Sequence, residues 1–141
     1  MTAEEKYRQE HPKRNVAMVG IRDTVGNILL VRTHKLTAYW QPIGGGVDAE
    51  DETPQNAAVR EIQEELGIEV SPKDLRPIIE TPYDFGEGTI YFYELEIDRM
   101  TTKFEVDEEE IIDHSWFSPS EAQQLEAFPA TQAYLRTLSQ R

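Results

Sequence analysis

Apolar runs in the first part of the chain predict a pair of buried strands. Residues 15–21 are apolar at almost every position, which is typical of a strand covered on both faces. Residues 23–27 supply the glycine and asparagine of a tight turn, and residues 28–31 are again apolar without a break. We therefore expect these two segments to pair antiparallel.

The periodicity changes to that of a helix in the middle of the chain. Between Thr53 and Leu66 the apolar residues follow helical spacing, Pro54 suits the first turn, and Gly67 ends the helix. The same criteria predict strands over 75–80, 89–97 and 115–117, and helices over 3–10, from 118 toward 125, and over 130–138. Since strands outnumber helices and one helix lies between strands, we expect one α/β domain over residues 1–141, with helices on both faces of a mixed sheet.

The central helix gathers three carboxylates on one flank. On an ideal wheel of about 100° per residue, its buried stripe consists of Ala58, Val59, Ile62 and Leu66. Glu65, Glu61 and Glu64 lie about 60°, 100° and 160° to one side of that stripe. Like charges at these spacings destabilise a helix by roughly 0.2–0.5 kcal/mol per pair, and Arg60 can balance only part of the charge. We therefore expect a divalent cation such as Mg²⁺, held by carboxylates and a backbone carbonyl of the glycine-rich bend.

Two other interpretations explain less of this segment. An ordinary solvated face would account for two adjacent glutamates, but it leaves the glycine triplet at 44–46 and Gly67 without a reason. A calcium-binding EF-hand loop fails because its glycine position holds Thr53 and its closing acidic position holds Val59.

The segment around the central helix resembles the box of the Nudix hydrolases. It matches that motif at all defined positions, which are Gly46, Glu52, Arg60, Glu61, Ile62, Glu64, Glu65, Gly67 and Ile68. Trp40 ahead of the glycines, and Glu110 followed by Trp116 and Phe117, look like features that flank the box in this family. The chain is thus identified as a member of the Nudix family, with its subfamily open.

This resemblance implies an α/β/α sandwich and an enzyme that hydrolyses the diphosphate linkage of a nucleoside diphosphate joined to another group, such as a nucleoside triphosphate. The cofactor would be Mg²⁺, with Mn²⁺ as a substitute. The implied ligands are three glutamates and one glycine carbonyl, from Glu61, Glu64, Glu65 and Gly44 or Gly45. The glycine stays ambiguous because Ile43 separates Pro42 from the triplet and the loop is one residue longer than in the common family pattern.

The resemblance also assigns the other catalytic roles. Arg60 and Glu52 would pair and brace the loop against the helix. Metal-activated water would attack phosphorus, and an acid would accept its proton. Glu110 has the best register for that base, while Glu108, Glu109 or a glutamate of the box are alternatives.

Substrate contacts are less determined by the sequence. Arg32, with His34 and Lys35 nearby, could contact phosphate, and Trp40 or Tyr83 could stack on a base. Gly45 and Gly46 would let the loop approach the substrate closely. The competing interpretation of each side chain is a surface cation or an aromatic residue of the core.

Composition limits the partners. The charge sum is 14 − 27 = −13, so the field of the molecule opposes binding to duplex nucleic acid, and small nucleotides are expected instead. The first residues are charged and no run approaches about 20 apolar residues, so we expect a cytoplasmic protein without a membrane partner. The oligomeric state stays open, a homodimer included. A catalytically silent nucleotide sensor is the alternative function, although such a domain would typically have lost acids of the box.

Overall fold

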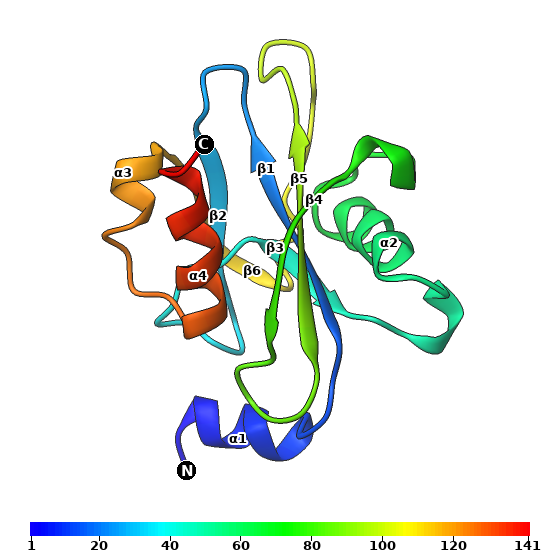
Figure 1. Ribbon diagram of the computed structural model, residues 1–141, viewed down its shortest axis with the longest axis vertical. Helices are drawn as coiled ribbons and strands as arrows, with labels where there is room; N and C mark the ends of the chain where they lie inside the picture. Colours follow the sequence, from blue (N-terminus) through cyan, green and yellow to red (C-terminus); the bar gives the residue numbers. More distant parts are fainter.

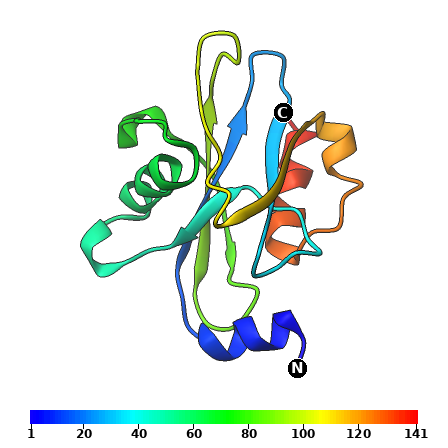
Figure 2. The same ribbon diagram turned by 180° about the vertical axis from the view of Figure 1, so that it is seen from behind.

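The computed structural model describes all residues from 1 to 141 and contains a mixed six-stranded sheet between helices (Figure 1). The strands are β1 (Val16–Arg22), β2 (Ile28–Thr33), β3 (Ile43–Gly46), β4 (Arg76–Pro82), β5 (Thr89–Glu96) and β6 (Ile111–Phe117). The helices are α1 (Ala3–Glu10), α2 (Pro54–Leu66), α3 (Pro119–Ala122) and α4 (Pro129–Leu138), with 3₁₀ turns over Ala49–Asp51 and Pro72–Asp74. Figure 2 shows from behind that α2 and α4 lie on opposite sides of the sheet, which confirms the expected α/β/α layers.

The central strand β1 pairs with β5 along one edge and with both β2 and β3 along the other edge. The sheet order is β4-β5-β1-β2-β6, with β1 and β5 parallel and the other pairs antiparallel. β2 pairs with the end of β1 at Ile21 and Arg22, so the expected hairpin is confirmed. β3 pairs with the first part of the same edge, from Val16 to Val19. The two partners therefore meet different stretches of one strand edge.

Alternate residues of β1 face two separate cores, because successive side chains of a strand point to opposite faces. Ala17 and Val19 pack in the core that contains Ile62 of α2. Val16 packs in the core that contains Tyr134 of α4. None of the helices combines the length and apolar character needed to cross a membrane.

Most predicted elements agree with the structure within a few residues, and two differ. The helix expected from 118 toward Leu125 ends at Ala122, because the next amides, those of Gln124 and Leu125, donate to carbonyls three residues back and form turns instead. The last strand begins at Ile111 rather than at residue 115. Its first half pairs with β2 at the edge of the sheet and contains only two apolar residues, Ile111 and Ile112, before Asp113 and His114, which is too short an apolar run to predict a strand.

A buried glutamate ties the end of the chain to the sheet. Glu94 of β5 is 4% exposed and accepts hydrogen bonds from Tyr134 Oη (2.6 Å), Arg76 (2.8 Å), Arg22 (3.3 Å) and two nitrogens of Arg141 (2.6 and 2.8 Å). Burial alone would raise the pKa of Glu94, but these donors outweigh it and lower the pKa to about 2. This carboxylate is fully compensated inside the protein.

Candidate active site

Local sequence fixes both ends of α2. The Thr53 hydroxyl accepts a hydrogen bond from the Asn56 amide (3.1 Å), and Pro54 occupies the first turn. Gly67 follows the last turn in a left-handed conformation (φ 69°), which glycine adopts without a steric penalty. The helix therefore holds its carboxylates at a fixed height and rotation.

Burial of the three carboxylates follows the order expected from the helix wheel. Glu65 is 1% exposed, Glu61 is 7% exposed, and Glu64 is exposed to solvent. The apolar stripe differs at one position, since Ala57 is fully buried while Val59 is only partly buried. The flank predicted to lie beside the core therefore carries two buried acids.

Glu61 and Glu65 form a buried acidic pair against β3 (Ile43–Gly46), which we call the glycine strand. Oε2 of Glu65 accepts a hydrogen bond from the Gly44 amide (3.0 Å). A Cβ atom at Gly45 would come within 2.5 Å of Oε1 of Glu61, so only glycine lets the strand approach this closely. Burial raises the pKa of Glu65 well above its usual range, and the charge of Glu61 raises it further. Burial also raises the pKa of Glu61.

Arg60 joins the glycine strand, the following loop and the helix. Its Nε and Nη2 donate to the two carboxylate oxygens of Asp51 (2.9 Å each), and Nη2 also donates to the Gly46 carbonyl (3.0 Å). Nη1 donates to Glu61 (3.0 Å) and to Glu64 (3.3 Å). Arg60 thus compensates part of the charge of Glu61, whereas no cation pairs with Glu65.

The expected brace between Arg60 and Glu52 is wrong, because Asp51 occupies that place. The additional loop residue forms part of a 3₁₀ turn over Ala49–Asp51, closed by reciprocal hydrogen bonds between Asp48 and Asp51. This turn directs Asp51 inward, where it is 7% exposed, and leaves Glu52 exposed with a φ of 66°. Arg60 therefore still connects the loop to the helix, but through Asp51, one residue before the predicted Glu52.

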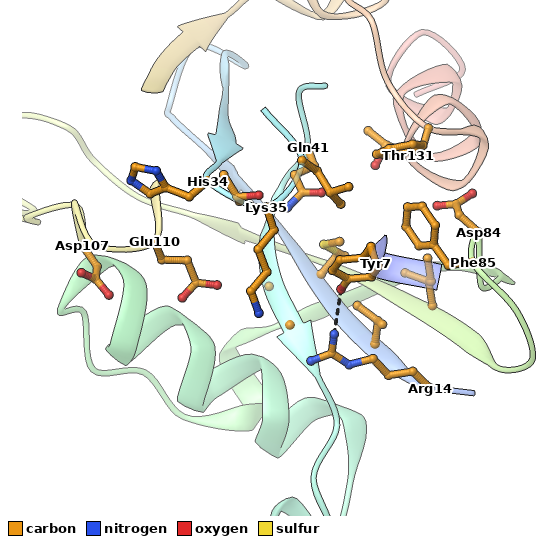
Figure 3. Close-up of a pocket in the computed structure, with 18 of the residues that line it drawn as sticks. Tyr7, Arg14, His34, Lys35, Gln41, Asp84, Phe85, Asp107, Glu110 and Thr131 are labelled. Carbon is orange, nitrogen blue, oxygen red and sulfur yellow. Dashed lines mark hydrogen bonds between the residues drawn. The ribbon is translucent and has the colours of Figure 1, made fainter. Parts of the chain in front are cut away.

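A cavity of about 400 Å³ opens on the other side of the glycine strand (Figure 3). Figure 3 shows a polar end at His34, Asp107 and Glu110 and a mostly apolar end at Tyr7, Asp84, Phe85 and Thr131. The cavity is also lined by Lys35, Gly44, Gly45 and Glu109, and by the apolar residues Val16, Leu36, Ile90 and Phe128. Gly44 and Gly45 are therefore the wall between this cavity and the buried acidic pair.

Two cations on the cavity have no acidic partner. Neither Arg14 nor Lys35 makes an ion pair, although the chain carries an excess of acids. Arg14 donates to the Tyr7 hydroxyl (2.7 Å), and its guanidinium lies close over Gly46. Figure 3 shows the Lys35 side chain extending across the cavity toward the glycine strand. Both side chains can bind an anionic ligand.

The acidic loop before β6 brings its carboxylates to the polar end of the cavity. Glu110 and Glu109 line the cavity, whereas Glu108 does not. The charge of Glu110 contributes to the raised pKa values of Glu61 and Glu65. Glu110 and Glu109 therefore both line the cavity, and Glu110 stays the predicted base.

Arg32 and Trp40 do not line the cavity, contrary to the expectation that they contact substrate. Arg32 donates to Asp113 (2.8 Å) and lies over the ring of Trp40, 5.2 Å from its centroid. Trp40 packs edge-on against Phe117. The strand ends at Thr33, and the two residues after it, His34 and Lys35, turn into the cavity instead.

Tyr83 and Gly46 also have structural positions. Tyr83 is 5% exposed and its hydroxyl donates to the carbonyl of His11 (2.7 Å), so it cannot stack on a bound base. Gly46 faces the guanidinium of Arg14 rather than the cavity. The aromatic wall of the cavity comes from Tyr7, Phe85 and Phe128, which the sequence pattern did not single out.

The donor set suits a hard divalent cation but is not gathered into a cluster of three side chains. No three His, Asp or Glu side chains lie close enough together to form a metal site, since Glu64 turns toward Arg60. Glu61 and Glu65 remain, with Gly44 and Gly45 of β3 next to them. Because two adjacent buried carboxylates require positive charge and offer oxygen ligands, the residues present fit Mg²⁺ or Mn²⁺.

Comparisons with solved structures show the same fold. A MutT protein from Methanosarcina mazei Go1 is 22% identical, with a TM-score of 0.71 over 93% of this chain and 96% of that one. The dihydroneopterin triphosphate pyrophosphohydrolase of E. coli is 19% identical, with a TM-score of 0.71 over 89% and 95% of the two chains. An Ap4A hydrolase from C. elegans is 19% identical, with a TM-score of 0.70 over 90% and 96%.

The sequence comparisons give the family. No curated protein matches the chain. The family model described as NUDIX domain matches residues 11–138, which include the glycine strand, α2 and the acidic loop. Together with the buried acidic pair and the fold, this match shows that the chain belongs to the Nudix family of hydrolases.

Proposed function

We propose that this protein hydrolyses the diphosphate linkage of a nucleoside triphosphate or related nucleotide with Mg²⁺, for which Mn²⁺ can substitute. The observation that carries the proposal is the buried pair of Glu61 and Glu65, which no cation of the chain fully compensates. The cavity next to this pair carries two unpaired cations, Arg14 and Lys35. The acidic pair can thus bind a metal ion, while Arg14 and Lys35 can bind the phosphates of a substrate in the adjacent cavity.

Glu61 and Glu65 would hold the metal, and Glu64 would join them by leaving Arg60. Gly44 is the glycine whose carbonyl we propose as a further ligand, since its amide already contacts Glu65. When bound, a divalent cation neutralises phosphate charge and lowers the pKa of water. Arg60, through Asp51 and the Gly46 carbonyl, would keep the glycine strand at a fixed distance from α2.

Glu110 would act as the general base. Its carboxylate lies at the polar end of the cavity, which Gly44 and Gly45 also line (Figure 3). It would accept the proton of the attacking water, and a phosphorus–oxygen bond of the anhydride would break. Two phosphorylated products would result.

The rest of the cavity would bind the substrate. Lys35 and Arg14 would contact phosphate oxygens, and the apolar end would take the nucleoside. The names of the similar structures mention a pterin triphosphate and a dinucleoside polyphosphate, which supports a small phosphorylated substrate. The strongly negative net charge supports the same class over nucleic acid, and a cytoplasmic location suits such substrates.

The proposal is tested with a panel of nucleoside triphosphates, oxidised nucleotides, nucleotide sugars and dinucleoside polyphosphates, each incubated with and without Mg²⁺. We expect hydrolysis of at least one class, only with the metal, and a loss of at least about 10²-fold in Glu65→Gln. Glu69→Gln, an exposed glutamate just beyond α2, is the matched control and should keep the wild-type rate.

The alternative of a silent nucleotide sensor makes the opposite prediction. Such a module would bind members of the panel without releasing product at any metal concentration. Equal rates in wild type and Glu65→Gln would contradict the assignment of this metal ligand.

A further inference from the structure

Asp84 stands at the apolar end of the cavity, at the opposite end from Glu110 (Figure 3). It belongs to the loop between β4 and β5, which lies beside α1 in both views of the fold (Figures 1 and 2). The ring of the next residue, Phe85, packs 4.8 Å from Tyr7 of α1 and 4.9 Å from Phe128. A single carboxylate is therefore set among aromatic rings.

The carboxylate of Asp84 is only half satisfied within the protein. Its Oδ1 accepts a hydrogen bond from the Ala130 amide (3.0 Å), while Oδ2 has no donor and no ion pair is formed. Arg8 lies nearby but donates to the backbone carbonyl of Asp84 and lies over the ring of Phe85. Partial burial raises the pKa of Asp84. Oδ2 is therefore free to accept a hydrogen bond from a ligand in the cavity.

The two ends of the cavity therefore suit two chemically different parts of one ligand. Next to Lys35 and the glycine strand the cavity suits phosphate, and next to Asp84 it suits a flat ring that presents N–H groups. An ionised carboxylate only accepts hydrogen bonds. Guanine presents an imino N–H and an exocyclic amino group side by side, whereas adenine and cytosine present one amino group beside an acceptor nitrogen that would face the carboxylate.

We infer that Asp84 is a specificity-determining residue that accepts hydrogen bonds from the imino and amino groups of a guanine base, so that the cavity selects guanine nucleotides. The inference rests on the proposed function, because the orientation of the nucleotide follows from phosphates bound near the acidic pair. Phe85 and Tyr7 would cover the base, and Thr131, which is 3% exposed and lines the same end, would limit its size.

Asp84 also has a structural role that the test must separate. Its bond to Ala130 satisfies an amide in the first turn of α4, where the residue before the helix, Phe128, offers no side-chain cap. Removing the carboxylate could therefore loosen α4. Asp84→Asn keeps an oxygen for the Ala130 amide and replaces the free oxygen with a donor, so it changes base recognition while preserving the cap.

The experiment compares binding of GMP and IMP, which differ only in the amino group of the base, by calorimetry in EDTA. Wild type should bind GMP at least about ten-fold more tightly than IMP, since the site would lose a hydrogen bond to a charged group with IMP. In Asp84→Asn this ratio should fall to within about two-fold, with an unfolding temperature equal to that of wild type. Equal binding of GMP and IMP by wild type, no binding of either, or a preference that survives Asp84→Asn would overturn the inference.

Hydrolysis distinguishes failure of the inference from failure of the proposed function. If nucleoside triphosphates are cleaved with Mg²⁺ but GTP and ITP at equal kcat/KM, the enzyme assignment stands and the role of Asp84 is wrong. If GMP is preferred through Asp84 but no phosphorylated compound is cleaved, base recognition stands and the proposed activity is wrong.

Discussion

Two buried glutamates of this protein, Glu94 and Glu65, are almost equally hidden and have opposite environments. Glu94 is surrounded by three guanidinium groups and a phenol, and its pKa is lowered to about 2. Glu65 accepts from one backbone amide and lies next to the acid Glu61, and burial and the charge of Glu61 raise its pKa. Burial alone therefore does not mark a functional site.

What distinguishes the two sites is where their compensation comes from. The protein supplies every donor that Glu94 needs, so the Glu94 site is structural and fixes the C-terminal segment to the sheet. At Glu65 the chain supplies a second carboxylate, that of Glu61, instead of a cation, and both lie behind the glycines that line the cavity. Burying an ionised acid without a partner costs free energy, so the ionised pair of Glu61 and Glu65 is stable only when a cation from solution binds to it.

Removing Glu94 should cause the largest loss of stability. Glu94→Ala leaves three arginines around a vacant carboxylate position, and breaking such a buried network costs about 3–5 kcal/mol of unfolding free energy. Urea denaturation at neutral pH measures this cost. Glu96→Ala, an exposed glutamate on the same strand, serves as the control and should change the free energy by less than about 0.5 kcal/mol. A Glu94→Ala protein as stable as this control would contradict the contrast.

Glu110→Gln should affect the rate and leave the fold intact. Loss of a general base typically costs about 10²–10⁴-fold, so we expect kcat to fall by about 10²-fold or more. The Mg²⁺ concentration for half-maximal activity should change much less than kcat, because Glu110 acts on the proposed ligands only through its charge. Glu108→Gln is the neighbouring control outside the cavity. An unchanged kcat in Glu110→Gln would move the base to the box or to Glu109.

The two buried acids should give stability slopes of opposite sign against pH. The folded pKa of Glu94 is lowered from 4.5 to about 2, so its contribution of about 3 kcal/mol is complete above pH 4.5 and is lost as the pH falls toward 2. The folded pKa of Glu65 is raised, so without metal its ionisation weakens the fold as the pH rises above 4.5. Urea titrations in EDTA of Glu94→Gln and Glu65→Gln against wild type measure both slopes, and slopes of the same sign would refute the contrast.

Weakening the contact between Asp51 and Arg60 should cause the smallest loss of stability among these variants. Asp51→Asn removes charge from two hydrogen bonds to Arg60, which should lower the unfolding free energy by about 1–3 kcal/mol. Glu52→Gln, one residue later and exposed, should stay within about 0.5 kcal/mol of wild type. Thermal unfolding of the two variants measures the difference, and a larger loss in Glu52→Gln would restore the pairing that the sequence predicted.

Local spacing was enough to predict helix α2, which carries the buried acidic pair. The caps at Thr53 and Gly67 and the burial order of the acids on α2 depend on residues within a few positions of one another. The brace was wrong because one additional loop residue changed the backbone path, and the helix spacing carries no information about that turn. Asp51, rather than Glu52, therefore meets Arg60.

The cavity and the compensation of Glu94 could not be predicted in this way. Asp84 meets Ala130 across 46 positions, and Glu94 meets Arg141 across 47. Arg14 precedes the first strand with no local pattern that marks it, and its lack of an acidic partner is visible only in three dimensions. Contacts of this kind depend on which strands the sheet places side by side.

Crystals soaked in Mn²⁺ test the central claim most directly, because the anomalous signal of the metal locates it without an assumption about the substrate. The account predicts an ion about 2.1 Å from carboxylate oxygens of both Glu61 and Glu65, next to the glycine strand. A fully soaked crystal in which these two side chains bind no ion and point apart into solvent would contradict it.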